Sequence, residues 1–251
     1  MNREAQAAVL LLTGVALLHA GLSDLYLRYV KAGLQPLLLA AGAVLVVAAL
    51  ATVRYELRRP RGSEEDRDDG RRDAHDAGHT HPHSQAHREP KVAWLLVLPL
   101  VALVLVAPPA LGSYSANRSG TSVPRPFGFP TLPAGDPLRM ESGDYAGRAV
   151  YDHGRSLSGR RFVLTGFVSI GRDGTPYLTR MVLNCCAADA RPVKIGLTGQ
   201  VPPVLRPDAW LEVTGTYTPR RAEDPVNNGP VPFLDVTRAR PVREPAEPYE
   251  G

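Results

Sequence analysis

Two adjacent cysteines, Cys185 and Cys186, are the only cysteines of this 251-residue chain, and Asp189 follows them in the stretch VLNCCAADARP (residues 182–192). Zinc and other divalent metals are held by thiolate, imidazole and carboxylate ligands, so these three residues form a candidate metal site. A redox-active dithiol is an alternative. A structural disulfide between the neighbours, or an inert pair of one buried and one spare thiol, also stays open.

Whether the two thiols can act together depends on the local backbone. Successive side chains of a strand point to opposite faces, so an unbroken strand through residue 186 would separate Cys185 from Cys186. The turn-forming residues that follow, up to Pro192, allow the strand to end earlier and the thiols to converge. His153 is a further candidate ligand, although the sequence does not place it near the pair.

A second group of candidate metal ligands is a run of histidines in a charged stretch. Five of the chain's seven histidines lie in HDAGHTHPHSQAH, residues 75–87. Because the surrounding loop, 54–91, is charged and poor in apolar residues, we expect it to be disordered. A flexible imidazole cluster binds zinc, nickel or copper with modest affinity, as a metal buffer does; a solvated spacer is the alternative. The five residues are His75, His79, His81, His83 and His87.

Three apolar stretches predict helices that cross a membrane, at about residues 5–27, 34–53 and 92–111. The second and third each hold about 20 residues without a charge, which as helices match the hydrocarbon core of a bilayer. The first stretch has the charged start and apolar centre of a signal peptide as well, so cleavage is an alternative to a span. The sequence therefore predicts a multi-pass protein of the cell membrane.

The charges beside these stretches predict how the chain is threaded. Loops rich in arginine and lysine tend to stay in the cytoplasm. Arg28 and Lys31, in the short first loop, are outnumbered by six basic residues at the two ends of loop 54–91, which we therefore place in the cytoplasm. Everything after residue 111 is then extracytoplasmic. The six residues are Arg54, Arg58, Arg59, Arg61, Arg88 and Lys91.

The C-terminal part of the chain has the pattern of an all-β domain. Residues 112–137 are rich in proline, which favours an extended linker. In the following domain, 138–251, apolar residues recur with period two in five short stretches separated by turn residues, which predicts an OB-like five-stranded barrel. These stretches are 161–170, 176–186, 193–199, 210–219 and 232–242.

Several function classes find no support in the sequence. A phosphate-binding loop, a G-x-S-x-G elbow and an H-E-x-x-H motif are missing, so we do not expect an enzyme. OB-like barrels often bind nucleic acids through exposed aromatic residues and a basic groove. The predicted strands carry few aromatic residues and lie outside the cell, so we expect no nucleic-acid partner.

The stretches LTGFV, LTRMVLNCCAADARP and WLEVTGTY resemble the YcgQ-like family of bacterial membrane proteins. Its members join N-terminal spans to a domain of unknown function with a Cys-Cys-x-x-Asp signature. The resemblance implies that Cys185, Cys186 and Asp189 occupy that signature and that Arg180 matches the arginine before it. It also implies a multi-span permease as the membrane partner, and a connection with zinc limitation.

These observations predict an accessory subunit of a permease that handles zinc or another divalent metal. The extracytoplasmic barrel would present the two cysteines and Asp189 to the ion, and the cytoplasmic histidines would receive or buffer it. The apolar stretches 5–22, 34–53 and 92–111 contain no carboxylate, which makes them a poor ion path, so the partner must form the pore. A membrane-tethered thiol redox protein or sensor and a structural scaffold are the alternatives.

Overall fold

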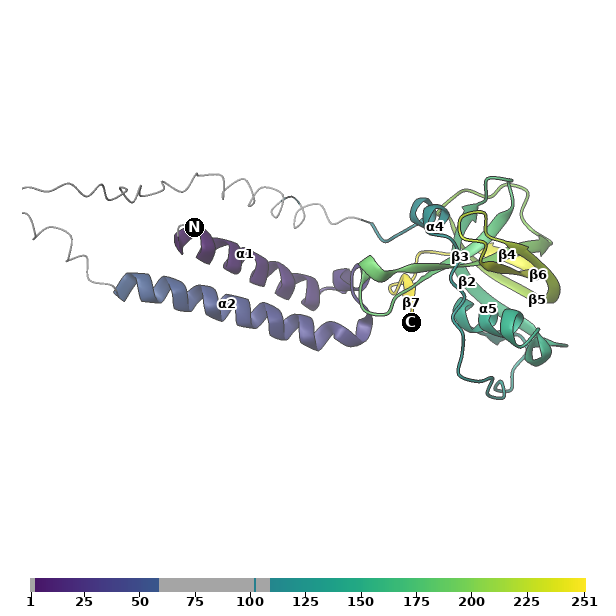
Figure 1. Cartoon of the computed structure of the whole chain (residues 1–251), viewed down its shortest axis with the longest axis horizontal. Helices are drawn as coiled ribbons and strands as arrows, with labels where there is room; N and C mark the ends of the chain where they lie inside the picture. Colours follow the sequence, from purple (N-terminus) through teal and green to yellow (C-terminus); the bar gives the residue numbers. More distant parts are fainter. Residues whose placement is uncertain (1–2, 59–101, 103–108) are drawn as a thin grey trace, which may run out of the picture. The chain divides into compact units, whose positions relative to one another are not determined.

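The computed structural model describes residues 3–58, 102 and 109–251 (Figure 1). The histidine run, 75–87, and nearly all of the predicted span 92–111 lie outside the described residues. The chain divides into two compact units, which are described separately below. One comprises Met1–Leu22 and Pro36–Pro108, and the other comprises Ser23–Gln35 and Pro109–Gly251.

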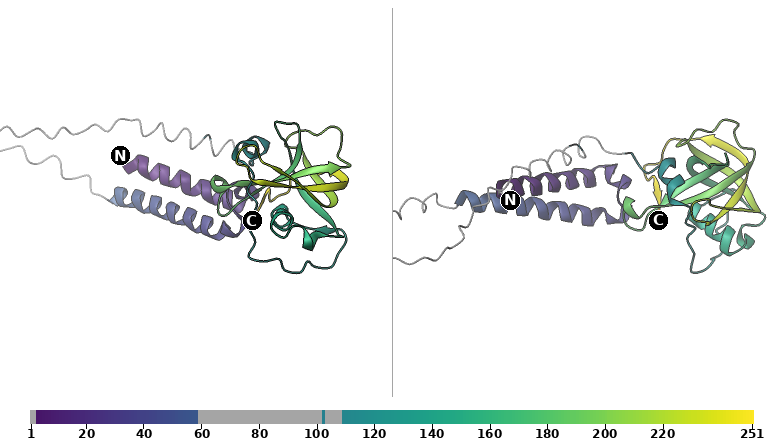
Figure 2. Two further views of the ribbon diagram at one scale, coloured as in Figure 1. Left: turned by 45° about the vertical axis from the view of Figure 1, so that its right-hand side comes forward. Right: turned by 45° about the horizontal axis from the view of Figure 1, so that its top comes forward.

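The first unit contains the helices α1 (Arg3–Leu22) and α2 (Gln35–Arg58), which lie side by side (Figures 1 and 2). They approach closely at Gly14, where an added Cβ atom would lie only 3.0 Å from the carbonyl oxygen of Gly42. Small residues at such crossings let helix backbones pack tightly in a bilayer. The segment Ala32–Tyr55 is long and apolar enough to cross a membrane, whereas the apolar helix Gln6–Leu22 is shorter.

The second unit is built on a closed five-stranded barrel, as the period-two pattern predicts. The strand order is β2–β5–β6–β4–β3, and pairing of β3 with β2 closes the barrel. All neighbours are antiparallel except β4 and β6. The strands are β2 (Arg161–Ile170), β3 (Pro176–Val182), β4 (Arg191–Gly199), β5 (Trp210–Glu223) and β6 (Pro230–Pro241).

Shorter elements surround the barrel. β1 (Leu138–Arg139) pairs with β2, and β7 (Tyr249–Glu250) pairs with β3, both in parallel. The helix α5 (Ser142–Tyr151) packs against the barrel (Figure 2). Its Tyr145 is fully buried and donates a hydrogen bond of 2.8 Å to the carbonyl oxygen of Phe233.

The barrel interior holds the apolar residues that alternate along each strand. Inward-facing positions of neighbouring strands meet there because side chains of a strand alternate between its two faces. Gly166 of β2 is needed where β3 crosses, since an added Cβ atom would lie 2.7 Å from the carbonyl oxygen of Thr179. The fully buried side chains include Leu164, Val168, Leu178, Ile195, Val213 and Leu234.

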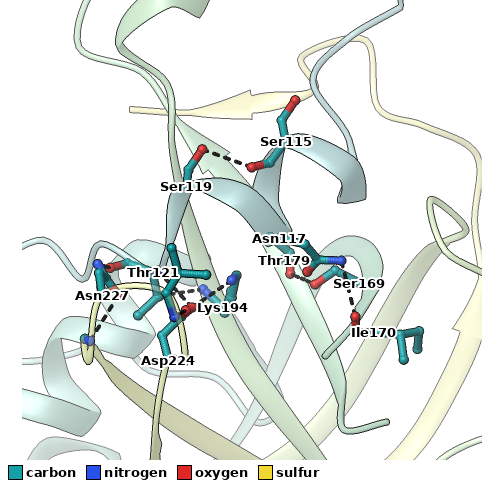
Figure 3. Close-up of polar contacts among 12 residues, drawn as sticks. Ser115, Asn117, Ser119, Thr121, Ser169, Ile170, Thr179, Lys194, Asp224 and Asn227 are labelled. Atoms are coloured by element: carbon teal, nitrogen blue, oxygen red, sulfur yellow. Dashed lines mark hydrogen bonds and ion pairs between the residues drawn. The ribbon is translucent and has the colours of Figure 1, made fainter. Parts of the chain in front are cut away.

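The segment that precedes the barrel differs from the predicted extended linker. Its first part forms the short helix α4 (Ser113–Ser119), because the prolines begin only at Pro124. Asp208 binds the N-terminal end of α4, accepting hydrogen bonds from the backbone N–H of Ser113 (2.6 Å) and from its hydroxyl (2.9 Å). Near its other end, Asn117 donates to the carbonyl oxygen of Ile170 (Figure 3).

A buried ion pair fastens this segment to the barrel (Figure 3). Lys194 Nζ lies 2.7 Å from Asp224 Oδ2, and the two side chains are 4% and 1% exposed. The same carboxylate oxygen accepts the backbone N–H of Thr121 at 2.9 Å, and the Thr121 hydroxyl accepts the backbone N–H of Lys194. The pair therefore joins β4, the turn after β5 and the residues after α4.

Asp224→Ala is expected to destabilise the second unit strongly, because it leaves the Lys194 ammonium buried without its partner. Breaking one side of a buried pair costs about 3–5 kcal/mol. The measurement is urea unfolding of the full-length protein in detergent, followed by near-ultraviolet circular dichroism. The double variant Lys194→Met/Asp224→Leu should recover much of the loss, and Asp136→Ala, in the exposed pair with Arg161, should change little.

Candidate functional site

The cysteines lie in a short loop between β3 and β4. β3 ends at Val182, and a single 3-10 turn, η5 (Ala187–Asp189), follows Cys186. The carboxylate of Asp189 turns back and accepts two backbone N–H groups, those of Asn184 (3.1 Å) and Cys185 (2.9 Å). Aspartate commonly closes turns in this way. These two hydrogen bonds close a turn, so β3 ends before the cysteines.

The loop brings the two thiols together. Their sulfur atoms are 3.6 Å apart, and both thiols are free, with Cys185 exposed and Cys186 half-buried. The two cysteines are therefore not part of a strand, and their side chains are not directed to opposite faces of the sheet. Leu183 takes the buried position at the end of β3 instead, with 2% of its surface exposed. Two sulfurs at this separation can contact the same ion.

The Asp189 carboxylate also sets the protonation of the site. Its hydrogen bond with Cys185, followed by the neighbouring Cys186 thiol, raises the pKa of Cys185 to about 11. The same Cys185 hydrogen bond, together with backbone N–H groups, holds the pKa of Asp189 below its usual range. Near neutral pH, Cys185 is therefore a protonated thiol beside a carboxylate. A metal ion would have to displace that proton.

A segment far away in the sequence completes the loop. Residues 24–34, the α1–α2 loop, contain two 3-10 turns, η1 (Asp24–Arg28) and η2 (Ala32–Leu34). Between the turns, Val30 forms an antiparallel bridge with Cys186. The backbone N–H of Lys31 donates to the carbonyl oxygen of Cys185 (3.1 Å), and that of Ala187 donates to the carbonyl oxygen of Tyr29 (2.7 Å). Sequence reasoning missed this contact.

The C-terminal strand β7 lies against the same region. The backbone N–H of Leu183 donates to the carbonyl oxygen of Glu250 at 2.9 Å. The hydroxyl of Tyr249 accepts the N–H of Leu111 (2.9 Å) and donates to the carbonyl oxygen of Arg28 (3.1 Å). This one hydroxyl therefore joins the α1–α2 loop, the start of the segment before α4, and the end of the chain.

Arg180, the arginine singled out by the family resemblance, is a residue of β3 that contacts β7. Its guanidinium is 3.3 Å from the carboxylate of Glu250, and both side chains are 9% exposed. It also donates to the carbonyl oxygen of Glu247 and lies over the ring of Trp210. Burial raises the pKa of Glu250 and lowers that of Arg180. Arg180 therefore anchors β7 rather than facing an ion.

Other predicted ligands lie elsewhere. His153 follows α5, where its ring nitrogen is 3.4 Å from Arg221 and its carbonyl oxygen accepts the hydroxyl of Tyr217. The five loop histidines are outside the described residues. Within the ranges 3–58 and 109–251, the structure shows no group of three or more His, Cys, Asp or Glu side chains arranged to hold a metal. A polar cleft of about 350 Å³, lined in part by Asn184, Asp189 and Arg191, opens beside the loop.

The barrel domain matches a known family model. Residues 134–250 match the family described as DUF1980 C-terminal domain. The match includes the whole barrel, the cysteine loop and the C-terminal strand, but it leaves out the N-terminal helices and the α1–α2 loop. A search of curated proteins and a search of solved structures found no match.

Asp189→Asn in a Cys186→Ser background should make Cys185 more reactive, because the carboxylate is the largest cause of its raised pKa. A thiol reacts as its thiolate, so we expect the alkylation rate at pH 8 to rise roughly tenfold. The measurement is the pH profile of iodoacetamide labelling, whose midpoint should move down. Asp173→Asn is the matched control, since Asp173 also closes a turn. Equal profiles for the two variants would contradict the assignment.

Proposed function

We propose that the C-terminal part of the chain, whose residues 134–250 match the DUF1980 C-terminal domain, presents a divalent metal ion with the ligands Cys185, Cys186 and Asp189. Zinc is the ion that suits this ligand set best. The proposal makes the chain an accessory, non-enzymatic subunit of a multi-span permease. It also takes the barrel to be OB-like, on the strand order and the parallel β4–β6 pair.

The separation of the two sulfurs carries the proposal. In a tetrahedral zinc site with Zn–S bonds of about 2.3 Å, two thiolate sulfurs lie about 3.8 Å apart. The observed 3.6 Å is close to that value. A linear two-coordinate ion with bonds of the same length would need about 4.6 Å. The loop therefore favours an ion of tetrahedral preference and needs little rearrangement to accept it.

The incomplete ligand set suits an ion that is passed on. Two thiolates and one carboxylate leave a fourth position of a tetrahedral ion open to water or to a partner. Structural zinc sites are closed by four protein ligands, whereas sites that exchange a ligand keep one position open. Cys185 is exposed, so a permease could reach an ion bound there. The proposal therefore assigns the site to delivery or capture rather than to folding.

The placement of the site relative to the membrane also supports the proposal. The α1–α2 loop pairs with the cysteine loop through backbone hydrogen bonds, and it is covalently continuous with α1 and α2. If both helices span the bilayer, the α1–α2 loop and the cysteine loop that it binds lie on the same side of the membrane. We assign this side to the exterior. The histidines between 75 and 87 would then buffer the ion in the cytoplasm.

The competing hypothesis of a thiol redox protein is disfavoured by the electrostatics of the loop. Reactive cysteines usually have a lowered pKa, from a nearby positive charge or a helix N-terminus. Here the nearest charge is the Asp189 carboxylate, and it raises the pKa of Cys185 to about 11. Such a thiol attacks a disulfide slowly at neutral pH. A metal ion instead supplies the positive charge that removes the proton.

Zinc binding should depend on both cysteines. The test uses full-length protein in detergent with the five loop histidines changed to alanine, so that their own zinc binding does not interfere. Zinc competition with a chromophoric chelator should show affinity falling by more than about a hundredfold in Cys185→Ser and in Cys186→Ser, because loss of a ligand exceeds the effect of losing an outer contact. The affinity of the parent should rise from pH 6 to pH 8, since binding releases thiol protons.

Two outcomes of that titration bear on the proposal. Asp173→Asn, in an exposed turn of the barrel, should bind zinc with the affinity of the parent. This control tests whether the removal of a carboxylate elsewhere affects zinc binding. Equal zinc affinity in the parent and in both serine variants would end the metal assignment.

The topology predicts which residues a membrane-impermeant maleimide can reach in intact cells. Cys185 in the native chain should be labelled. In a Cys185→Ser/Cys186→Ser background, a cysteine introduced by Ser63→Cys, in the loop assigned to the cytoplasm, should be labelled only after the membrane is permeabilised. Labelling of position 63 in intact cells, together with protection of Cys185, would reverse the assigned orientation.

A further inference from the structure

The α1–α2 loop binds the cysteine loop through backbone hydrogen bonds. Val30 and Cys186 are opposite each other in an antiparallel bridge, and the hydrogen bonds on either side involve the N–H of Lys31 and the carbonyl oxygen of Tyr29. In this geometry the bridged residues form the non-hydrogen-bonded kind of pair, whose side chains are the closest. The loop thus acts as a two-bond strand beside the thiols.

These two bonds restrain the backbone that carries both thiols. The carbonyl oxygen of Cys185 accepts the N–H of Lys31, so the peptide between Cys185 and Cys186 cannot rotate without breaking that bond. The N–H of Ala187 fixes the next peptide against Tyr29. Asp189 holds the preceding side of the loop through the N–H of Cys185. The direction of each sulfur therefore depends on the α1–α2 loop as well as on the loop's own carboxylate.

We propose that residues 29–31 are a positioning strand for the cysteine pair, so that occupancy of the site by a metal ion and docking of the α1–α2 loop stabilise each other. The proposal rests on the proposed function for the identity of the bound ion. Coupling between two events is reciprocal: if docking improves the geometry of the ligands, then a bound ion must hold the loop in place to the same extent. A permease that contacts α1 or α2 could therefore sense whether the site is filled.

The hydroxyl of Tyr249 supports this coupling from a second direction. It donates to the carbonyl oxygen of Arg28, immediately before the positioning strand, and accepts the N–H of Leu111. Leu183, next to the cysteine loop, is bound in turn to Glu250 of the same short strand. The docked loop is therefore held at the cysteines and at β7, two places that share one edge of the barrel.

Lys31 offers an unusually selective substitution. Its backbone has φ −58° and ψ 139°, values that proline adopts without strain. The preceding residue, Val30, lies in an extended bridge, which is the conformation that proline prefers before it. Lys31→Pro thus removes the N–H that binds Cys185 and leaves the path of the chain unchanged. Lys31→Ala is its reference, because it loses the ammonium group but keeps the N–H.

The experiment compares Lys31→Pro with Lys31→Ala in full-length protein in lipid nanodiscs, with the five loop histidines changed to alanine. We expect zinc to bind Lys31→Pro roughly three- to tenfold more weakly than Lys31→Ala, as the loss of one hydrogen bond predicts. Zinc should also slow amide hydrogen exchange of residues 29–34 in the parent. Equal zinc affinity of the two variants, with no change of exchange in the parent, would overturn the positioning role while the metal site itself stands.

A second probe makes the test independent of zinc. Phenylarsine oxide condenses with two thiols, forming two As–S bonds and releasing one water, so its reaction depends on how the pair is placed. Lys31→Pro should react more slowly than Lys31→Ala. If the parent binds no zinc, the proposed function fails, and this reaction alone decides whether residues 29–31 position the thiols. Identical rates would refute that role.

A reciprocal variant guards against a folding defect. Ala187, the first residue of η5, is a position where proline is tolerated at the start of a helical turn, and Ala187→Pro removes the other hydrogen bond, to Tyr29. Both proline variants should keep the near-ultraviolet circular dichroism of the barrel. Both should also bind zinc more weakly and react more slowly with phenylarsine oxide. A loss of zinc affinity or of reaction rate in only one of the two variants would assign the effect to local distortion. It would refute the claim that residues 29–31 position the thiols through two hydrogen bonds.

Discussion

The carboxylate of Asp189 is the constraint from which the cysteine site follows. By accepting the N–H groups of Asn184 and Cys185, it ends the pleated strand that would otherwise separate the two thiols. It also lies beside Cys185 and keeps that thiol protonated. One side chain thus sets both the geometry and the chemistry of the pair.

The site depends on three parts of the chain that are far apart in sequence. The cysteine loop supplies the thiols, residues 29–31 supply the adjacent backbone, and β7 supplies the Tyr249 hydroxyl that binds Arg28 and Leu111. Residues 29–31 lie between the helices α1 and α2, and β7 pairs with β3. The geometry of the cysteine pair is therefore set by contacts between distant segments and not by its own loop alone.

Two buried ion pairs fix the supporting elements. Lys194 and Asp224 secure the residues after α4, and Arg180 and Glu250 secure β7. Buried pairs gain little net stability over apolar packing, but they impose a specific geometry, because an unpaired buried charge is costly. We therefore interpret both pairs as devices that hold chain segments in register at the edge of the barrel. Arg180, despite its place in the family resemblance, belongs to this group and not to the candidate ligands.

Local patterns in the sequence were enough to predict the barrel and to single out the candidate ligands. The alternation of apolar residues in the β2 stretch RFVLTGFVSI involves residues only two positions apart, so it can be recognised without knowledge of the tertiary structure. The types and spacing of Cys185, Cys186 and Asp189 indicated their chemistry equally directly. The convergence of the thiols was left open, because it depends on where β3 ends. The pairing of Val30 with Cys186 had no signal at all, since backbone hydrogen bonds between residues so far apart involve no particular side chain and arise only when the chain is folded.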